Sequence, residues 1–379
     1  MIFVLIIIAF ILIDYIILIS AFIIGVFQIK KLNKNILELR SDNNKNLKFS
    51  IVIPFRNEEK NIENLITNLA NQHYPKAQYQ VILIDDFSTD NSMEIARKVA
   101  ENHPQISIKI LSNIISGKKE ALKLGINNAD FDLIVATDAD CSHNKLWLNE
   151  IANFQSQENC VLIIAPVKIA SSNSFFGKFQ EIEFLSLQAS SIGSAGINNP
   201  IMCNGANLVY QKKHFLEADI KNEIASGDDM FLLHSIKNNS KNKIGYLFTE
   251  NAIVTTNSSI NLKSFISQRI RWASKAKYYN DSFSKITALL VLTIAISEIL
   301  LLVFSCFNKY YLQVFIIVFL IKSLIDIILL SYVNRTYKIK NLLLLLLPFE
   351  IVYLFYNITI GFLSLFSQSF TWKGRKYNY

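Results

Sequence analysis

The sequence is poor in charged residues and in cysteine. Charged residues make up 18% of its 379 residues, below the roughly 25% usual in soluble domains, whereas hydrophobic residues make up 51%. This composition excludes a disordered or collagen-like chain. The four cysteines form no C-x-x-C pair and no dense framework, which excludes a disulfide-rich mini-protein and favours reduced thiols.

The excess apolar residues gather near the two ends of the sequence. About 20 apolar residues in a helix span the hydrocarbon core of a bilayer. We therefore expect one transmembrane helix over residues 1–28 and about three more over residues 286–367. The first run lacks the basic start and the small-residue cleavage site of a signal peptide. The pattern predicts a membrane protein with a soluble middle part.

Basic residues flank these apolar runs, and the formal net charge is +8. They cluster in residues 29–48, expected as a linker, in residues 263–285, expected as an amphipathic interfacial helix, and in residues 334–340. Basic clusters beside apolar runs are typical of a cytoplasmic membrane face, with lipid rather than nucleic acid as the partner. We therefore expect a multi-pass protein of the cell (inner) membrane whose soluble part faces the cytoplasm.

If each apolar run crosses the membrane in turn, the charge pattern is violated at the C-terminal tail. A cytoplasmic start for the first C-terminal run leaves the basic tail, residues 368–379, on the outside. Either the third run re-enters near Pro348, or the tail breaks the positive-inside rule. Charged residues also lie within the apolar runs, and the simplest interpretation is internal pairing, for example of Lys322 with Asp326.

Residues 49–262 alternate strand and helix patterns, as expected of a catalytic domain built on a sheet. Short β-rich apolar runs are followed by segments with apolar residues at helical spacing. Such alternation predicts an α/β fold with a mainly parallel sheet. The expected strands cover residues 49–54, 81–85, 106–111, 133–137 and 161–165, and the expected helices cover residues 58–72, 89–101 and 117–127.

Polar residues follow three of the expected strands, at the edge where ligands bind in parallel sheets. Asp138 and Asp140 lie two positions apart, so in a strand both side chains point to one face. Two such carboxylates suit Mg²⁺ or Mn²⁺, which can bind a diphosphate. Asp85 and Asp86 can accept hydrogen bonds from a nucleobase or a ribose, and the alternative is a cap of the following helix by Ser88 or Thr89.

Three further positions carry candidate chemistry. Lys118 opens a helix and can meet a phosphate, although an ordinary solvated lysine is the alternative. Asp229 can act as a general base on an incoming hydroxyl, with helix capping by Asp228 as the alternative. In Q-R-I-R-W at residues 268–272, arginine can pair with a leaving diphosphate and tryptophan can stack on a sugar. The alternative there is a helix anchored at the lipid headgroups.

The order and spacing of these motifs resemble those of the membrane-bound family 2 glycosyltransferases, which include cellulose, hyaluronan and chitin synthases. The resemblance covers residues 49–280 closely and the membrane arrangement loosely. Each motif is weak alone, but the set is specific. The motifs are S-I-V-I-P-F-R-N-E-E at 50–59, Q-H-Y-P at 72–75, I-D-D-F-S-T-D-N-S at 84–92, G-K-K-E-A-L at 117–122, T-D-A-D-C at 137–141, C-N-G-A-N at 203–207, G-D-D at 227–229 and Q-x-x-R-W at 268–272.

The resemblance implies a GT-A fold, a nucleotide-sugar donor that is most often a UDP-sugar, and an inverting transfer with Asp229 as catalytic base. It implies Mg²⁺ or Mn²⁺ as cofactor, with Asp138 and Asp140 as metal-binding residues. The implied donor-binding residues are Pro54, Asn57, Glu58, Asp85, Asp86, Lys118, Asp138 and Arg271. The implied acceptor-binding residues are Asn204, Gly205, Asp228, Gln268 and Trp272.

Two positions depart from the family pattern. The family often has Glu–Asp where this chain has Asp228–Asp229, and the charge is kept. Glycine is commoner where this chain has Phe87, so we expect this bulky side chain to reshape the nucleobase pocket.

The sequence leaves more than one function open. One hypothesis is a processive synthase that extends a polysaccharide, and another is a transferase that adds one or a few sugars to a lipid-linked acceptor such as a polyprenyl phosphate or glycolipid. A non-catalytic membrane scaffold is a remote alternative, because acidic residues stand at every expected motif position. No feature of the sequence identifies a partner subunit.

Overall fold

The computed structural model describes residues 2–38, 46–221, 224, 226–367, 369–373 and 375–378. The chain divides into two compact units, each built from separate stretches of sequence. Unit 1 contains residues 1–28, 171–201 and 259–368, and unit 2 contains residues 29–170, 202–258 and 369–379. The expected linker 29–48 lies partly outside the described residues, and its first ten residues continue the N-terminal helix.

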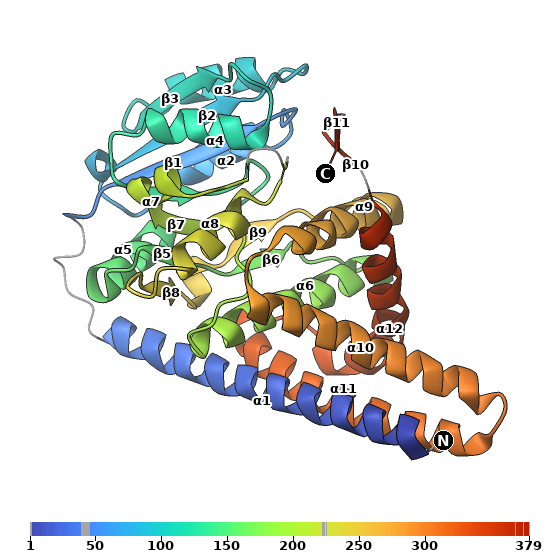
Figure 1. The fold of residues 1–379 in the computed structure, drawn as a ribbon. Helices are drawn as coiled ribbons and strands as arrows, with labels where there is room; N and C mark the ends of the chain where they lie inside the picture. Colours follow the sequence, from blue (N-terminus) through green and yellow to red (C-terminus); the bar gives the residue numbers. More distant parts are fainter. Residues whose placement is uncertain are drawn as a thin grey trace. The chain divides into compact units, whose positions relative to one another are not determined.

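Unit 2 is built on a seven-stranded sheet with the strand order β3-β2-β1-β4-β7-β5-β8 (Figure 1). Strands β3, β2, β1 and β4 run parallel, whereas β7 runs antiparallel to both of its neighbours. The sheet is therefore mainly parallel, as predicted. The strands are β1 (Phe49–Phe55), β2 (Tyr79–Asp85), β3 (Ser107–Ser112), β4 (Leu133–Ala136), β5 (Leu162–Ile164), β7 (Leu208–Gln211) and β8 (Ile244–Tyr246).

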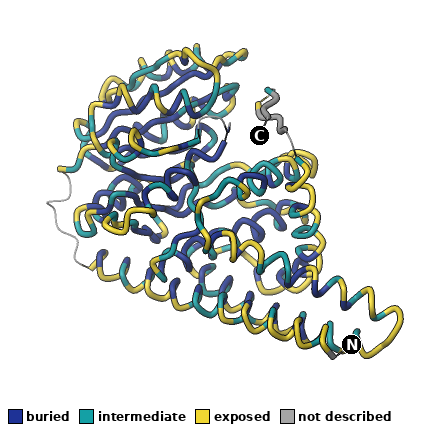
Figure 2. The backbone as a smooth tube through the Cα atoms, in the orientation of Figure 1, coloured by how far each residue is buried: buried dark blue, intermediate teal, exposed yellow. Residues whose placement is uncertain are grey.

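Helices and short turns connect these strands. Every residue of β2 is buried, and β1 is buried except for half-buried Pro54, so these strands form the centre of the core (Figure 2). Helix α4 packs on β1 and β2. The connecting helices are α2 (Ile62–Ala70), α3 (Ser92–Glu101), α4 (Lys118–Asn127), α5 (Trp147–Glu158), α7 (Lys212–Glu217) and α8 (Asp228–Lys237), with 3₁₀ turns at Lys76–Gln78 and Glu250–Ala252.

Two smaller strand pairs complete unit 2. Strands β6 (Val167–Ile169) and β9 (Val254–Thr256) pair in parallel. Strands β10 (Ser369–Trp372) and β11 (Arg375–Asn378) form an antiparallel hairpin downstream of the apolar helices. The two described strands of the basic tail expected over residues 368–379 thus belong to the same unit as the large sheet.

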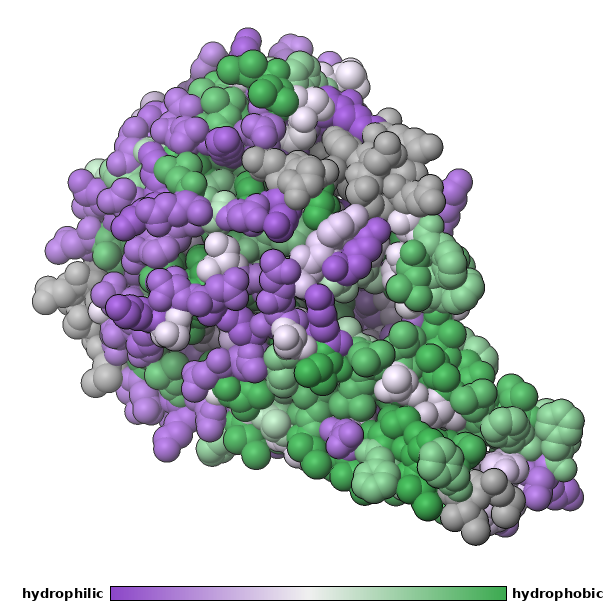
Figure 3. Space-filling view, viewed as in Figure 1, coloured by the Kyte–Doolittle hydropathy of each residue, from purple (hydrophilic) through white to green (hydrophobic). Residues whose placement is uncertain are grey.

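Unit 1 is helical. Among the described residues, four helices are long and apolar enough to cross a membrane, by length and composition. These are α1 (Ile2–Glu38, whose last residues belong to unit 2), α10 (Ser282–Ser305), α11 (Lys309–Tyr337) and α12 (Leu342–Phe366). The surface over α1 and α10 is mostly hydrophobic (Figure 3), as expected for helices that face lipid.

Two further helices of unit 1 are more polar. They are α6 (Phe175–Gly196) and α9 (Leu262–Ala273), the second of which begins at a capping box between Asn261 and Ser264. Helix α9 is followed by a 3₁₀ turn, Ser274–Tyr278, before α10 begins. The stretch expected as one amphipathic helix over residues 263–285 therefore consists of a helix, a turn and the start of α10.

Helix α6 packs closely on α1 through glycines. A Cβ atom placed on Gly25 would lie 2.0 Å from the carbonyl oxygen of Gly193, and one placed on Gly196 would lie 2.0 Å from the carbonyl oxygen of Gly25. The two backbones touch because these positions lack side chains, as in membrane helix pairs with small residues at the contact.

Charged side chains inside unit 1 pair with one another. The Lys322 ammonium lies 2.8 Å from the Asp326 carboxylate and 2.6 Å from that of Glu350 in α12. The hydroxyl of Tyr15 in α1 donates a hydrogen bond to Asp326 over 2.8 Å. Internal pairing of Lys322 with Asp326, the interpretation favoured by the sequence, is present, and it links three helices.

Candidate active site

The candidate donor residues of unit 2 lie at the carboxyl ends of β1, β2 and β4. In the sheet Phe55 lies opposite Asp85, and Val52 lies opposite Ala136. The residues that follow these strands therefore emerge at one edge. This edge carries Asn57 and Glu58 after β1, Asp85 and Asp86 at the end of β2, and Asp138 and Asp140 after β4.

Asp86 is almost fully buried, with 1% of its surface exposed. One carboxylate oxygen accepts hydrogen bonds from the Asn113 side chain over 3.0 Å and from the Gly117 backbone over 2.9 Å. Asp85 accepts from the backbone N–H of Ser88 over 3.1 Å and so closes the turn after β2. Helix α3 begins only at Ser92, after Asn91, so neither Ser88 nor Thr89 caps it.

Phe87 has a positive φ of 56°. This left-handed conformation costs an ordinary residue about 1–2 kcal/mol but suits glycine, which gives a physical reason why glycine is commoner at this position. The Phe87 side chain is 45% exposed, so it adds an aromatic surface beside Asp86.

The loops after β1 and β2 are tied together. The Asn57 backbone donates to the Ser88 hydroxyl over 3.0 Å, and the Asn57 side chain accepts from the Thr89 backbone over 2.8 Å. Asn57 also has a positive φ of 52°. The neighbouring Pro54, inside β1, is half-buried. These contacts hold the donor-side loops in a defined shape.

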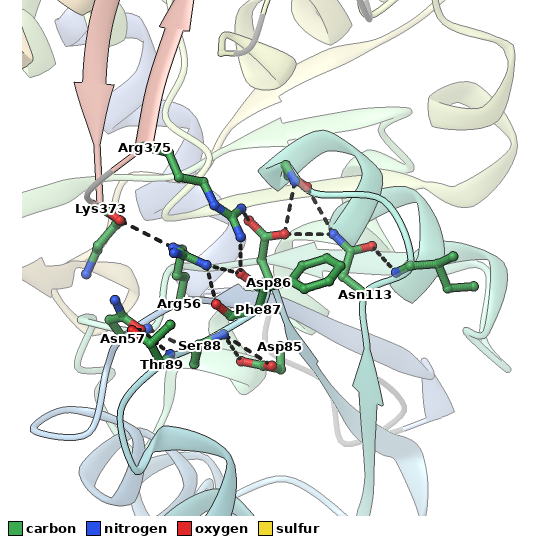
Figure 4. A network of polar contacts seen from close by, with 12 residues as sticks. Arg56, Asn57, Asp85, Asp86, Phe87, Ser88, Thr89, Asn113, Lys373 and Arg375 are labelled. Atoms are coloured by element: carbon green, nitrogen blue, oxygen red, sulfur yellow. Dashed lines mark hydrogen bonds and ion pairs between the residues drawn. The ribbon is translucent and has the colours of Figure 1, made fainter.

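The C-terminal hairpin reaches this edge (Figure 4). Arg375 donates to the second carboxylate oxygen of Asp86 over 2.9 Å, and Lys373 donates to Glu58 over 2.6 Å. Arg56 joins both sides, because it donates to the backbone oxygens of Asp86 over 2.9 Å and of Lys373 over 3.3 Å. The sequence analysis did not identify Lys373 and Arg375 as site residues. Their only signal was a basic tail that conflicted with the positive-inside rule.

Lys118 and Asp138 form an ion pair of 2.7 Å. Burial alone would lower the pKa of Lys118, but the carboxylates of Asp138, Asp228 and Asp229 raise it above its ordinary value. The lysine stays charged beside this acidic group. It lies at the start of α4, where the helix dipole also favours an anion.

Asp140 lies in an acidic and partly buried place. Burial raises the pKa of Asp140 to about 6, with further contributions from Asp138 and Glu58. The Thr256 hydroxyl donates to Asp140 over 3.1 Å. Unfavourable proximity of carboxylates is relieved when a cation binds between them.

These carboxylates therefore suit a hard divalent cation that is also coordinated by oxygen atoms of its substrate. Within the described residues, no group of three or more His, Cys, Asp and Glu side chains could hold a metal ion alone. Mg²⁺ is commonly bound by one or two carboxylates together with substrate phosphates, and Asp138 and Asp140 offer that number.

Asp229 and Gly205 lie together on the side expected for the acceptor. The Gly205 backbone donates to the Asp229 carboxylate over 3.1 Å. A Cβ atom on Gly205 would lie 3.8 Å from the Asp228 carboxylate, so both acidic side chains approach this glycine. The Asn204 side chain accepts from the Ala206 backbone over 2.9 Å and shapes the same turn.

Gln268, Arg271 and Trp272 lie in α9, which belongs to unit 1, whereas the other candidates belong to unit 2. The spacing i, i+3, i+4 places these three on one face of the helix. All three are half-buried.

Arg269, between Gln268 and Arg271, has a role that the sequence analysis did not assign. Its guanidinium forms a bidentate ion pair with Glu183 of α6, at 2.8 and 2.5 Å. Tyr356 of α12 donates to Glu183 over 2.8 Å. The arginine lies over the rings of Phe265 and Trp272, so it fixes α9 against α6 and α12.

Comparison with known families gives the class of domain. Residues 50–216 match the model of the family described as Glycosyl transferase family 2. This part of the chain is a family 2 glycosyltransferase domain, as the motifs suggested.

Curated relatives agree with this class. The chain is 28% identical over 122 residues to the poly(ribitol-phosphate) beta-N-acetylglucosaminyltransferase TarS of Staphylococcus aureus, which covers 32% of this chain and 21% of TarS. It is 32% identical over 132 residues to the poly-beta-1,6-N-acetyl-D-glucosamine synthase of S. aureus, which covers 35% of this chain and 31% of that enzyme. The chain thus spans a fifth to a third of the length of these relatives.

A solved structure matches over most of its length. The mannosyltransferase PcManGT from Pyrobaculum calidifontis, in complex with GDP-Man and Mn²⁺, superposes with a TM-score of 0.54 at 16% identity. The match covers 94% of this chain and 99% of that one. This similarity concerns the fold, which is of the GT-A type predicted from the sequence.

Proposed function

We propose that the protein is a membrane-bound inverting glycosyltransferase. It moves a sugar from a nucleotide-sugar, with UDP-sugars as the first choice, to a hydroxyl of a growing polysaccharide or of a lipid-linked acceptor. The observation that carries this proposal is the meeting of Asp86, Asp138 and Asp140 at one sheet edge, with Lys118 paired to Asp138.

The donor lies across this edge. Asp86 and Asp85 hold the nucleoside, and Asn57, Glu58 and the Pro54 backbone line the same side. Asp138 and Asp140 would hold Mg²⁺ or Mn²⁺, and the ion would supply positive charge beside the diphosphate. Lys118 adds a positive charge beside the diphosphate, and Arg271 pairs with the departing group.

Asp229 acts as the base. Its carboxylate takes the proton of the acceptor hydroxyl, and that oxygen attacks the anomeric carbon opposite the leaving diphosphate. The carbon–oxygen bond to the diphosphate breaks as the new bond forms, which inverts the configuration. Gly205, Asn204 and Asp228 line the acceptor side, together with Gln268 and Trp272.

The acceptor is taken from a membrane. Four long apolar helices support a multi-pass location, and the basic clusters beside them favour a catalytic domain on the cytoplasmic side. The structural neighbour PcManGT is a mannosyltransferase in complex with GDP-Man, so GDP-sugars are the second donors to test.

The test is UDP release by detergent-solubilised protein with a panel of UDP-sugars and Mn²⁺ or Mg²⁺. Asp229→Asn should abolish release while UDP binding, measured by calorimetry, is kept. The matched control is Asp219→Asn, whose exposed carboxylate pairs with Lys221 and should leave release unchanged. Turnover in Asp229→Asn at the unmodified rate would refute the base.

Product size separates the two kinds of acceptor. The radiolabelled product of a processive synthase would run as a long polymer on a gel, and that of a single addition would extract into organic solvent with lipid. Failure of UDP-, GDP- and dTDP-sugars in the presence of lipid extract would refute the enzymatic proposal as a whole.

A further inference from the structure

The C-terminal hairpin shares one unit with the donor edge, the edge of the sheet that carries Asp86, Asp138 and Asp140. Arg375 pairs with Asp86, and Lys373 pairs with Glu58, within unit 2. Groups that pair directly lie on the same side of a membrane. An even number of crossings must therefore separate Ser258, where the second stretch of unit 2 ends, from Ser369, where the hairpin begins.

Three apolar helices lie between these two points, namely α10, α11 and α12. If all three crossed the bilayer, the hairpin would be on the opposite side from Asp86. Within the proposed membrane location, at least one of the three therefore does not cross. The contacts of α6 identify which one.

Helix α6 and the residues just after it contact α1 where its apolar run ends, and α10 and α11 at one end each. In α1, Gly25 contacts Gly193, close to the last apolar residue of the run, Phe27. At the amino end of α10, the Ser284 hydroxyl donates to the backbone oxygen of Ile201, just beyond α6. At the carboxyl end of α11, the Tyr337 hydroxyl donates to Gln188 over 3.1 Å. These three ends belong to alternating chain directions, as expected for three crossings whose ends meet on one side.

Helix α12 contacts α6 by its middle instead. Tyr356 donates to Glu183 over 2.8 Å, and the hydroxyls of Tyr353 and Ser186 lie 3.1 Å apart. At 1.5 Å per residue, Tyr356 is about 21 Å along the axis from the start of α12. A helix along the bilayer normal would by then have passed most of a hydrocarbon core of about 30 Å. Figure 1 accordingly shows α12 at a steep angle to α10 and α11.

The two faces of α12 differ in chemistry. Its polar face carries Glu350, Tyr353 and Tyr356, all engaged with α6 or α11. An apolar stripe runs along the other side and is more than half exposed at each position. The stripe consists of Leu344, Ile351, Phe355, Phe362 and Phe366.

We infer that α12 does not cross the bilayer. It dips into the leaflet on the catalytic side, lays this stripe against the acyl chains and returns the hairpin to the donor edge. An amphipathic helix binds a membrane surface in this way. The molecule then has three crossings, α1, α10 and α11. The inference also places the basic loop 334–340 and the basic tail on one side, which removes the conflict found in the sequence.

Cysteine accessibility tests the inference in the full-length protein. Cys306, exposed in the turn between α10 and α11, reports the far side. In a Cys306→Ser background, Lys340→Cys reports the start of α12 and Tyr379→Cys reports the end of the tail. Spheroplasts are treated with a membrane-impermeant maleimide before or after permeabilisation, and labelled peptides are identified by mass spectrometry.

If three helices cross, Cys306 is labelled in intact spheroplasts. The cysteines of Lys340→Cys and Tyr379→Cys are then labelled only after the membrane is permeabilised. Labelling of Tyr379→Cys from outside, with Lys340→Cys protected, would mean that α12 crosses and would overturn the inference. Protection of Cys306 in intact spheroplasts would overturn it as well. UDP release by the same proteins is measured separately. A protein that releases no UDP but has the cysteines at positions 340 and 379 protected would contradict the proposed function and leave the inference about α12 intact.

Discussion

Breaking the Glu183–Arg269 pair should destabilise unit 1 strongly. The two side chains are 1% and 2% exposed, and Glu183 also accepts from Tyr356. Glu183→Gln keeps the shape of the side chain but leaves the Arg269 guanidinium buried without a counter-charge. Removing one partner of a buried ion pair typically costs about 3–5 kcal/mol.

Unit 1 contains about 170 residues, and this size allows the loss of stability to be expressed as a change in the midpoint temperature of unfolding. For domains of 150–250 residues, 1 kcal/mol corresponds to about 2–4 °C, so Glu183→Gln should lower the midpoint by roughly 6–20 °C. The double variant Glu183→Leu with Arg269→Met replaces both charges by apolar groups. It should be more stable than either single change, because no buried charge remains uncompensated.

The assay is the temperature at which half of the detergent-solubilised protein loses its monodisperse peak in size-exclusion chromatography. Glu38→Gln is the control, since its pair with Lys34 spans 3.7 Å with both side chains mostly exposed and contributes about 0.5 kcal/mol or less. A midpoint for Glu183→Gln equal to that of Glu38→Gln, or a double variant worse than both single ones, would refute the reasoning.

Three further predictions concern packing, donor binding and the metal. Gly25→Ala should cost about 1–3 kcal/mol by overpacking, because its Cβ would meet the Gly193 backbone, whereas Gly361→Ala meets only the flexible Leu292 side chain; equal melting temperatures of the two variants would contradict this. Asp86→Asn should weaken UDP binding by about 10- to 100-fold in calorimetry, the loss of a charge-assisted hydrogen bond of about 1.5–3 kcal/mol, and unchanged affinity would remove Asp86 from the donor site. Excess EDTA, or Asp140→Ala, should abolish sugar transfer, and full turnover in EDTA would remove the metal from the mechanism.

The sheet was largely predictable because its order follows local patterns. The apolar runs at residues 49–54 and 81–85 became β1 and β2 with boundaries shifted by one or two residues. Strand β7, at Leu208–Gln211, was not predicted. It is only four residues long and pairs antiparallel with β4 and β5, which lie far away in sequence. The local hydrophobic pattern of such a short strand does not reveal partners of this kind.

The candidate site could likewise be predicted only where local sequence patterns define it. Motif positions such as Asp86 and Asp138 follow strands, so their shared edge could be foreseen. Arg375 could not be, because 289 positions separate it from Asp86 and no local pattern links them. Arg269 shows the other difficulty, since its neighbours in the motif have the same spacing and charge while its partner, Glu183, lies on another helix.

The interleaving of the two units also sets an order of events during synthesis. Unit 2 includes residues 369–379, which leave the ribosome after all three C-terminal apolar helices. At about 5–20 residues per second, the 289 positions between Asp86 and Arg375 take roughly 15–60 s to translate. During this time Asp86 is still without its guanidinium partner. Completion of this edge of the sheet is therefore a late step, which follows the synthesis of α10, α11 and α12.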